Sequence, residues 1–293
     1  MPLGTRAWEQ ARTKAPRTAA PRIAQKAARP LSPEPQSAPA ASGVAAPGAS
    51  PLRPPPLPLP LPPDQASGQR PGRWSLDAWG FFRQGSDAAP ISQGRVPIYG
   101  ASQVGAIGQF RVAPSSRHDP RLYMRAYRAW VARGESEGAL GASIRPVPHV
   151  PLRAFAEVRY TDAAFASELR PAVFVVSELP PQLLPADFIL EAYGQGGWVG
   201  GSFATPFADG QLSLARELAS VTVPGAGPLR LSVGAGAWGG AQKDAQRLDI
   251  GPTLRADWRM GRVPARFTLD WRQQVAGDAA PESGLAATLS TSF

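Results

Sequence analysis

From Trp74 to Phe293, apolar and polar residues alternate in runs of about ten residues, separated by Gly, Pro, Asp and Ser. A period of two is the pattern of β-strands, whose successive side chains point to opposite faces. Runs of this length match tilted membrane-spanning strands of ~9–11 residues and exceed the ~5–6 of soluble sheets. The pattern predicts twelve strands, at 74–83, 101–112, 121–131, 138–145, 152–161, 169–178, 188–199, 209–217, 228–239, 247–259, 265–275 and 284–293.

The division into two faces is clearest in 152–161. There Leu152, Ala154, Ala156, Val158 and Tyr160 oppose Arg153, Glu157, Arg159 and Thr161. Three runs are less regular. The apolar face of 121–131 includes Arg128, the polar face of 169–178 includes Val173 and Val175, and 209–217 marks its face only by Leu212 and Leu214. We expect bulges or shifted strand boundaries in those three runs.

Connections alternate between long polar segments and tight turns, the arrangement of outer-membrane barrels. Aromatic residues near strand ends suggest the two interfacial girdles of such a barrel: Trp74, Trp79, Tyr99, Trp130, Tyr160, Trp198, Trp238, Trp258, Trp271 and Phe293. Twelve strands place both ends of residues 74–293 on the periplasmic side.

Alternation alone does not say which face is buried. A soluble sandwich would bury the apolar face, whereas a membrane barrel turns it toward lipid. Strand length, the aromatic positions and the mixed charges of the polar faces favour an all-β fold, a twelve-stranded antiparallel transmembrane up-and-down β-barrel. A soluble β-protein stays open as an alternative, because residues 1–30 contain no signal-like apolar run and overall hydrophobicity is modest.

Residues 1–73 differ from the rest. They hold 17 of the 34 prolines, and ten of the 31 Lys and Arg against three of the 22 acids, so most of the net charge of +9 lies there. Such a segment buries too little apolar surface to offset its ordering entropy. We expect a disordered extension that is a plain tail or a periplasmic spacer, with a proline-rich docking motif as the alternative. Nucleic-acid binding is not expected, since Trp8 is its only aromatic residue.

Few residues suggest catalysis. The chain has no cysteine, and its two histidines, His118 and His149, fall in predicted turns that are usually solvated. A Ser–His hydrolase in a barrel wall needs its histidine on a strand near the rim. Gly194–Gly197 has no strand-loop-helix context that would make it a phosphate loop. We therefore predict neither enzyme activity nor a metal or cofactor.

The polar faces converge on the predicted lumen. They carry Arg111, Arg125, Arg153, Arg159, Arg255, Arg266 and Arg272 together with Glu157, Glu191, Asp257 and Asp270. These charges would form either a structural plug of ion pairs or a basic track for an acidic sugar or another anion. The plug is slightly favoured, because twelve strands enclose little space.

The last run, 284–293, ends on Phe293 and resembles the final strand of outer-membrane barrels, whose terminal Phe is recognised by the barrel-assembly machinery. More widely, 101–293 resembles the C-terminal barrels of exopolysaccharide-secretion proteins, including the cellulose-synthase operon outer-membrane subunit, of bacteriophage adsorption proteins, and of uncharacterised alphaproteobacterial barrels. The resemblance is carried by Ser143–Pro146 through Tyr160, by Glu191–Gly194, by Val233–Gly240 and by the terminal strand.

The resemblance implies an outer-membrane location and a passive pore or the terminal barrel of an exopolysaccharide export system. It implies outer-membrane lipid, the assembly machinery and an anionic polysaccharide as partners. The alternative is a non-conducting structural or adhesive barrel, or a phage receptor. In the secretion proteins helical repeats precede the barrel, and residues 1–73 show none.

Overall fold

The computed structural model describes residues 72–86, 101–130, 134–163, 166–202, 204–223, 227–243, 245–261 and 263–293. All of them belong to one compact unit, Pro47–Phe293. The predicted disordered extension lies outside the described residues except for Gly72 and Arg73, and so does Tyr99.

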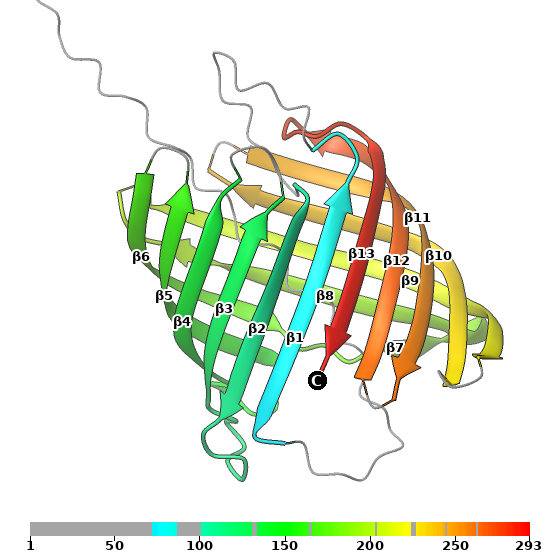
Figure 1. The fold of residues 1–293 in the computed structure, drawn as a ribbon, viewed down its shortest axis with the longest axis horizontal. Coiled ribbons are helices and arrows are strands. Elements are labelled where there is room, and N and C mark those ends of the chain that lie inside the picture. The colour runs from blue at the N-terminus through cyan, green and yellow to red at the C-terminus, as the bar shows by residue number, and fades with distance from the viewer. Residues whose placement is uncertain are drawn as a thin grey trace, which may run out of the picture. The chain divides into compact units, whose positions relative to one another are not determined.

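Twelve strands close into one antiparallel barrel (Figure 1). They are β1 Trp74–Arg83, β2 Gln103–Arg111, β3 Arg121–Ala129, β4 Ser136–Ile144, β5 Leu152–Ala163, β6 Ala166–Ser177, β8 Phe188–Val199, β9 Thr205–Val223, β10 Gly227–Gln242, β11 Ala245–Met260, β12 Val263–Gly277 and β13 Gly284–Ser292. Each strand pairs with its neighbours in the chain, and β1 pairs with β13 to close the wall. The predicted fold class is confirmed.

Phe293 continues the closing seam by one residue. Its amide donates to the Leu76 carbonyl at 2.8 Å, and the Leu76 amide donates back at 3.2 Å. Figure 1 shows the start of β1 beside the C-terminus at one end of the barrel. We call this the lower end and the opposite one the upper end.

The least regular part of the wall lies between β6 and β8. A three-residue strand, β7 at Gln182–Leu184, and a 3-10 turn at Pro185–Asp187 follow β6, and β7 pairs with the lower part of β8. Pro180 and Pro181 separate β6 from β7, and proline has no amide hydrogen to donate to a ladder. The sequence analysis did not predict β7.

The irregular runs have different outcomes. Val173 and Val175 face outward and β6 pairs with β5 without a bulge, but the strand begins at Ala166, so the boundary of 169–178 is shifted as expected. In 121–131, Arg128 faces outward with the apolar residues, and the strand ends at Ala129. The expectation is also confirmed for 209–217, because β9 runs over 19 residues. A bulge lies within it, since Leu231 pairs with Ala219 and Ser232 with Glu217.

The barrel wall has unequal heights. Strands β9 to β12 contain 15 to 19 residues, whereas β1 to β4 contain nine or ten. At ~3.3 Å per residue, β9 is about 60 Å long and far exceeds the ~25 Å apolar band of a membrane barrel.

The distribution of side chains is the reverse of that in a soluble protein. Large apolar side chains are exposed on the outer surface, for example Leu140 (66%), Leu169 (65%) and Leu254 (54%). The most buried large side chains are instead Arg83, Arg153 and Arg159, at about 1% exposure each. Since arginine is almost never fully buried in soluble domains unless it is paired, this barrel turns its apolar face outward.

The aromatic positions agree only in part with the girdle prediction. Trp74, Trp130, Trp198, Tyr160 and Phe293 are exposed near strand ends. Trp271 is exposed but lies in the middle of β12, and Trp258, near the end of β11, is only partly exposed. Trp79 and Trp238 were placed with them, but both indoles point into the barrel and are buried. Along β1, Trp79 has the same parity as Arg83, and along β10, Trp238 has the same parity as Gly236. The alternation of the strands therefore directs both indoles inward. None of the described residues belongs to a helix long and apolar enough to cross a membrane.

Candidate functional site

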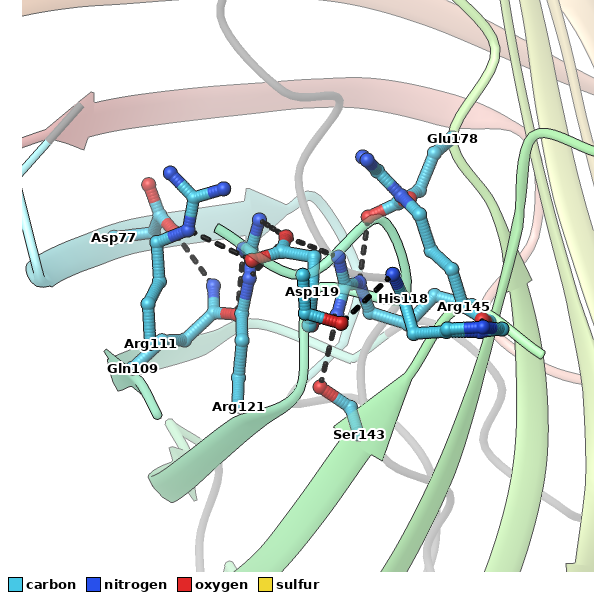
Figure 2. Close-up of polar contacts among 11 residues, drawn as sticks. Asp77, Gln109, Arg111, His118, Asp119, Arg121, Ser143, Arg145 and Glu178 are labelled. Carbon is cyan, nitrogen blue, oxygen red and sulfur yellow. Dashed lines mark hydrogen bonds and ion pairs between the residues drawn. The ribbon is translucent and has the colours of Figure 1, made fainter. Parts of the chain in front are cut away.

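An arginine cluster lies at the lower end of the lumen around Asp119, in the turn between β2 and β3 (Figure 2). The Asp119 carboxylate accepts hydrogen bonds from Arg111 Nε and Arg153 Nη2, both at 2.7 Å, and from Arg121 Nε at 2.9 Å. The backbone of Asp119 lies in the left-handed region, with φ at 44°, a conformation that Asp adopts more readily than most residues. Three strands are therefore held by one buried carboxylate.

Glu178 extends this cluster to the next two turns. Its carboxylate binds Arg153 Nε at 2.7 Å and Arg145 Nε at 2.5 Å, and its amide donates to the Pro151 carbonyl at 2.7 Å. The Arg145 amide donates to the carbonyl of His118, whose ring Nδ1 lies 2.8 Å from the Arg145 carbonyl (Figure 2). Side-chain and backbone bonds thus tie three successive turns together.

Both carboxylates are held ionised. Burial acts to raise the pKa of Asp119, but the hydrogen bonds from Arg121 and Arg111 and the charges of Arg121 and Arg153 outweigh it, so this pKa lies well below its ordinary value. Burial likewise opposes ionisation of Glu178, and Arg153 and Arg145 lower its pKa overall. The lower cluster therefore depends on both carboxylates being ionised to hold the three turns together.

Above this cluster, ion pairs from β3 to β6 fill one half of the lumen, which we call the filled half. Arg125 Nη2 donates to Glu137 at 2.7 Å and to Glu157 at 2.9 Å. Glu157 also accepts from Arg159 Nε and from the Tyr123 hydroxyl at 2.7 Å. Every one of these side chains is more than 90% buried.

Aromatic rings occupy what remains of the filled half. Phe155 and Phe174 are stacked with their centroids 4.8 Å apart, Tyr123 meets Phe155 edge-on at 5.4 Å, and Phe207 lies 6.2 Å from Phe174. The Arg159 guanidinium lies over Phe174 and Phe207 at 5.8 and 5.9 Å. Apolar and cationic groups therefore pack together as a solid plug.

The other half of the lumen, between β8 and β13 and closed by β1 and β2, contains two cavities; we call it the open half. The upper cavity, of about 100 Å³, is lined among others by Trp79, Arg83, Trp238, Arg255 and Arg272. The lower cavity, of about 150 Å³, opens toward the lower end between β8 and β12. Side chains of the described residues thus leave space on one side of the lumen.

A single carboxylate separates the two cavities. Glu191 binds Arg255 Nη2 at 2.9 Å and Arg266 Nη1 at 3.1 Å. Both arginines line the upper and the lower cavity. Arg266 has a second partner in Asp257, at 2.6 Å, and Asp257 is partly exposed. The boundary between the cavities is therefore a pair of guanidinium groups around one buried carboxylate.

A further cluster lies at the upper end. Arg83 binds Asp249 at 2.9 Å, and Arg247 binds the same carboxylate at 2.8 Å. Arg247 Nη1 also donates to the carbonyls of Ala279, at 2.5 Å, and of Pro281 in the loop between β12 and β13. This cluster anchors that loop against the rim of the upper cavity.

The residues predicted to line the lumen all lie inside the barrel, but not as one group. Arg111 and Arg153 join the lower cluster. Arg125, Arg159 and Glu157 belong to the filled half. The open half receives Arg255, Arg266, Arg272, Glu191, Asp257 and Asp270.

Several central residues were not predicted. Asp119 lies in a turn, where no strand periodicity marks it as buried. Glu137 precedes the strand predicted from residue 138, and Arg83 and Asp249 were on predicted strands but were not identified as site residues. Phe155 and Phe174 break the expected polar inner face, and only their parity with Arg153 and Arg170 could have placed them inside.

His118 and His149 are exposed, and the ring of His118 contacts the Arg145 carbonyl of a neighbouring turn. Among the described residues, no three His, Cys, Asp or Glu side chains are grouped so that they could hold a metal ion.

Comparison with known proteins gives fold-level likeness only. No protein-family model matches the chain, and no curated protein matches it. Among solved structures, it is similar to the porin NanC, with 8% identity over 74% of this chain and 98% of NanC and a TM-score of 0.35. It is also similar to an outer membrane channel from Pseudomonas putida F1, with 10% identity over 79% of this chain and 98% of that one and a TM-score of 0.39.

A third similar structure is OmpT, an outer membrane protein of Vibrio cholerae, with 7% identity over 75% of this chain and 97% of that one and a TM-score of 0.30. At this level of similarity the likeness says nothing about what this barrel conducts or binds.

Proposed function

We propose that this protein is an outer-membrane barrel that acts as a narrow passive pore. The observation that carries the proposal is the inversion of the barrel: exposed Leu, Val and Trp outside, and paired arginines inside. In water such an outer surface would be costly, whereas in lipid it is favourable. β1 begins and β13 ends at the lower end, so this end would face the periplasm together with the N-terminal extension.

Conduction is assigned to the open half. The side chains of the filled half are buried and packed as ion pairs and stacked rings. The two cavities of the open half follow one another along β11 and β12, and the Arg255–Glu191–Arg266 bridge lies between them. A small movement of these three side chains would join the cavities, so we propose a pore for small solutes.

Export of an exopolysaccharide is a weaker proposal for the same reason. A polymer chain needs a continuous wide passage, and half of this lumen is filled. A non-conducting anchor or receptor is the second candidate, and the lower cluster around Asp119 favours it, because that cluster covers part of the lower mouth with three joined turns.

Two experiments test the proposal. Expressed in bacteria with a secretory signal sequence added, the protein should fractionate with outer membranes and migrate differently on gels with and without boiling. Purified barrel in planar bilayers should give small, steady single-channel currents. Recovery as a soluble monomer would contradict the membrane assignment. Membrane insertion without any current would favour the anchor.

Phe293 is proposed as the contact for the assembly machinery. Its side chain is exposed at the end of the closing seam, while only its backbone bonds to Leu76. Changing Phe293→Ala should therefore lower the amount of folded barrel in cells without changing the stability of barrel refolded in detergent. Equal loss in both assays would assign Phe293 a structural role only.

A further inference from the structure

The upper cavity contains hydrogen-bond donors that have no acceptor. Arg255 Nη2 is bound to Ser213 at 2.7 Å and to Glu191, but its Nε has no hydrogen-bond partner among the described residues. The indole Nε1 of Trp79 has none either. Both side chains line this cavity and are more than 90% buried, at 6% and 5% exposure. Burying a donor without an acceptor is unfavourable, so an acceptor brought by a ligand would stabilise this site.

The acids of the same cavity are already engaged. Asp249 is bound by Arg83 and Arg247, Asp270 accepts from Thr253 Oγ1 at 2.6 Å and from Arg272 at 3.4 Å, and Asp209 accepts from Gln195 at 2.6 Å. The lining carries these three aspartates and four arginines, including Arg266. Arg255 and Arg266 are in turn balanced by Glu191 and Asp257, so the unpartnered donors of Arg255 and Trp79 are what favours an anion over a cation.

The rest of the wall is aromatic. The Arg272 guanidinium lies between Trp238 and Phe81, 4.5 and 4.9 Å from their ring centroids. Both indoles lie flat on a glycine, Trp79 on Gly105 and Trp238 on Gly236, where an added Cβ would come within 2.4 Å of the ring. These glycines keep the rings against the wall and leave flat apolar surfaces facing the cavity. Such surfaces suit the carbon skeleton of an organic solute better than a bare inorganic ion.

We propose that the upper cavity is a binding site for a small organic anion, a carboxylate carried on a compact carbon skeleton. Arg255 and Trp79 would donate to the carboxylate, and the Trp238–Arg272–Phe81 stack would support the skeleton. The proposal deepens the pore function and rests on it, since the anion reaches this site along the open half. The Arg255–Glu191–Arg266 bridge would then be the next contact on the path to the lower cavity.

The test is calorimetric titration of the full chain, folded in detergent, with propionate and with propionamide as its uncharged counterpart of the same shape. We expect saturable propionate binding and none for propionamide. Arg255→Gln should weaken propionate binding about tenfold or more, as expected for one charge-assisted hydrogen bond. Trp79→Phe keeps the ring, removes the N–H and should weaken binding less.

The matched control is Arg230→Gln. It removes the same charge from a residue that lines the lower cavity and lies outside the proposed site. It should leave propionate binding unchanged, and the gel shift on boiling confirms folding of every variant. Equal affinity for propionate and propionamide, or equal losses in R255Q and R230Q, would overturn the site. Currents without propionate binding would support the pore and refute the site, whereas propionate binding without current would support the site and refute the pore.

Discussion

The two halves of the lumen are built from the same residue types and behave differently. In the filled half, each carboxylate is shared between guanidinium groups and hydroxyls, and stacked rings take the remaining volume. In the open half, Glu191 serves two arginines and cavities lie on either side of it. Arginine in a barrel lumen therefore does not by itself indicate a pore. Whether a part of the lumen is filled or open depends on whether aromatic side chains occupy the space between the ion pairs.

The largest effect should come from the filled half. Glu157→Gln removes the charge that Arg125 and Arg159 share and weakens the bond from Tyr123. Breaking a buried ion pair by neutralising one partner costs about 3 to 5 kcal/mol, because it strands a buried charge. Denaturant unfolding of the barrel in detergent micelles measures this.

Glu191→Gln is the matched change in the open half. After this change Arg266 keeps Asp257 as a partner and Arg255 keeps Ser213, so the cost in stability should be clearly smaller. Equal costs would show that the charges of the two halves depend equally on their central carboxylate.

The next effect tests the outer wall. Leu254 pairs with Leu269 across β11 and β12 and is more than half exposed. If this surface meets lipid, Leu254→Arg should cost about 2 to 4 kcal/mol near the midplane of a bilayer. Thr268→Arg, on the lumen side beside the upper cavity, should cost much less. Unfolding from lipid vesicles distinguishes them, and similar losses for both variants would mean that the two faces are assigned wrongly.

A smaller effect is expected from closing the open half. Gly105→Ala would place a Cβ 2.4 Å from the Trp79 ring and turn the indole into the upper cavity. Overpacking of this kind costs about 1 to 3 kcal/mol, and single-channel current should fall. Gly80→Ala on the outer face meets only Val104, at 3.8 Å, and should change neither. Undiminished current in G105A would place the path elsewhere.

The smallest effect concerns the lower cluster and pH. The pKa of Asp119 and that of Glu178 are both lower in the folded barrel than the ordinary values near 4 that hold in the unfolded chain. Their contribution to stability is therefore complete above about pH 5 and is lost as pH falls through the folded-state values. Unfolding followed from pH 7 to pH 3 should show this loss, and Asp119→Asn should reduce it. A variant as pH-sensitive as the native chain would exclude Asp119 as its source.

Local pattern was enough to predict the strands. The run 188–199 has the boundaries that were predicted, and Leu254 and Leu269 are neighbours as their shared outer face implied. Each strand of a membrane barrel carries its own period-two signal, so twelve strands can be found one at a time. The short β7 could not be found this way, because three residues after two prolines carry no period.

The arrangement of the site needed the closed wall. Asp119 becomes buried only because Arg111, Arg121 and Arg153 reach it from three strands. Trp79 and Trp238 looked like girdle residues by their position, but parity turned them inward, where Gly105 and Gly236 make room for the rings. An arginine can line a cavity or pack on an aromatic ring. The outcome depends on contacts between strands that are distant in sequence.

The most direct test of a one-sided passage uses the absence of native cysteine in this chain. Single cysteines at Thr268, beside the upper cavity, and at Ala172, inside the filled half at 2% exposure, can be treated with a charged water-soluble thiol reagent in the folded barrel. We predict rapid modification and loss of current at Thr268→Cys, and protection at Ala172→Cys until the barrel is unfolded. Protection at both positions, or modification at both, would contradict a lumen that is filled on one side and open on the other.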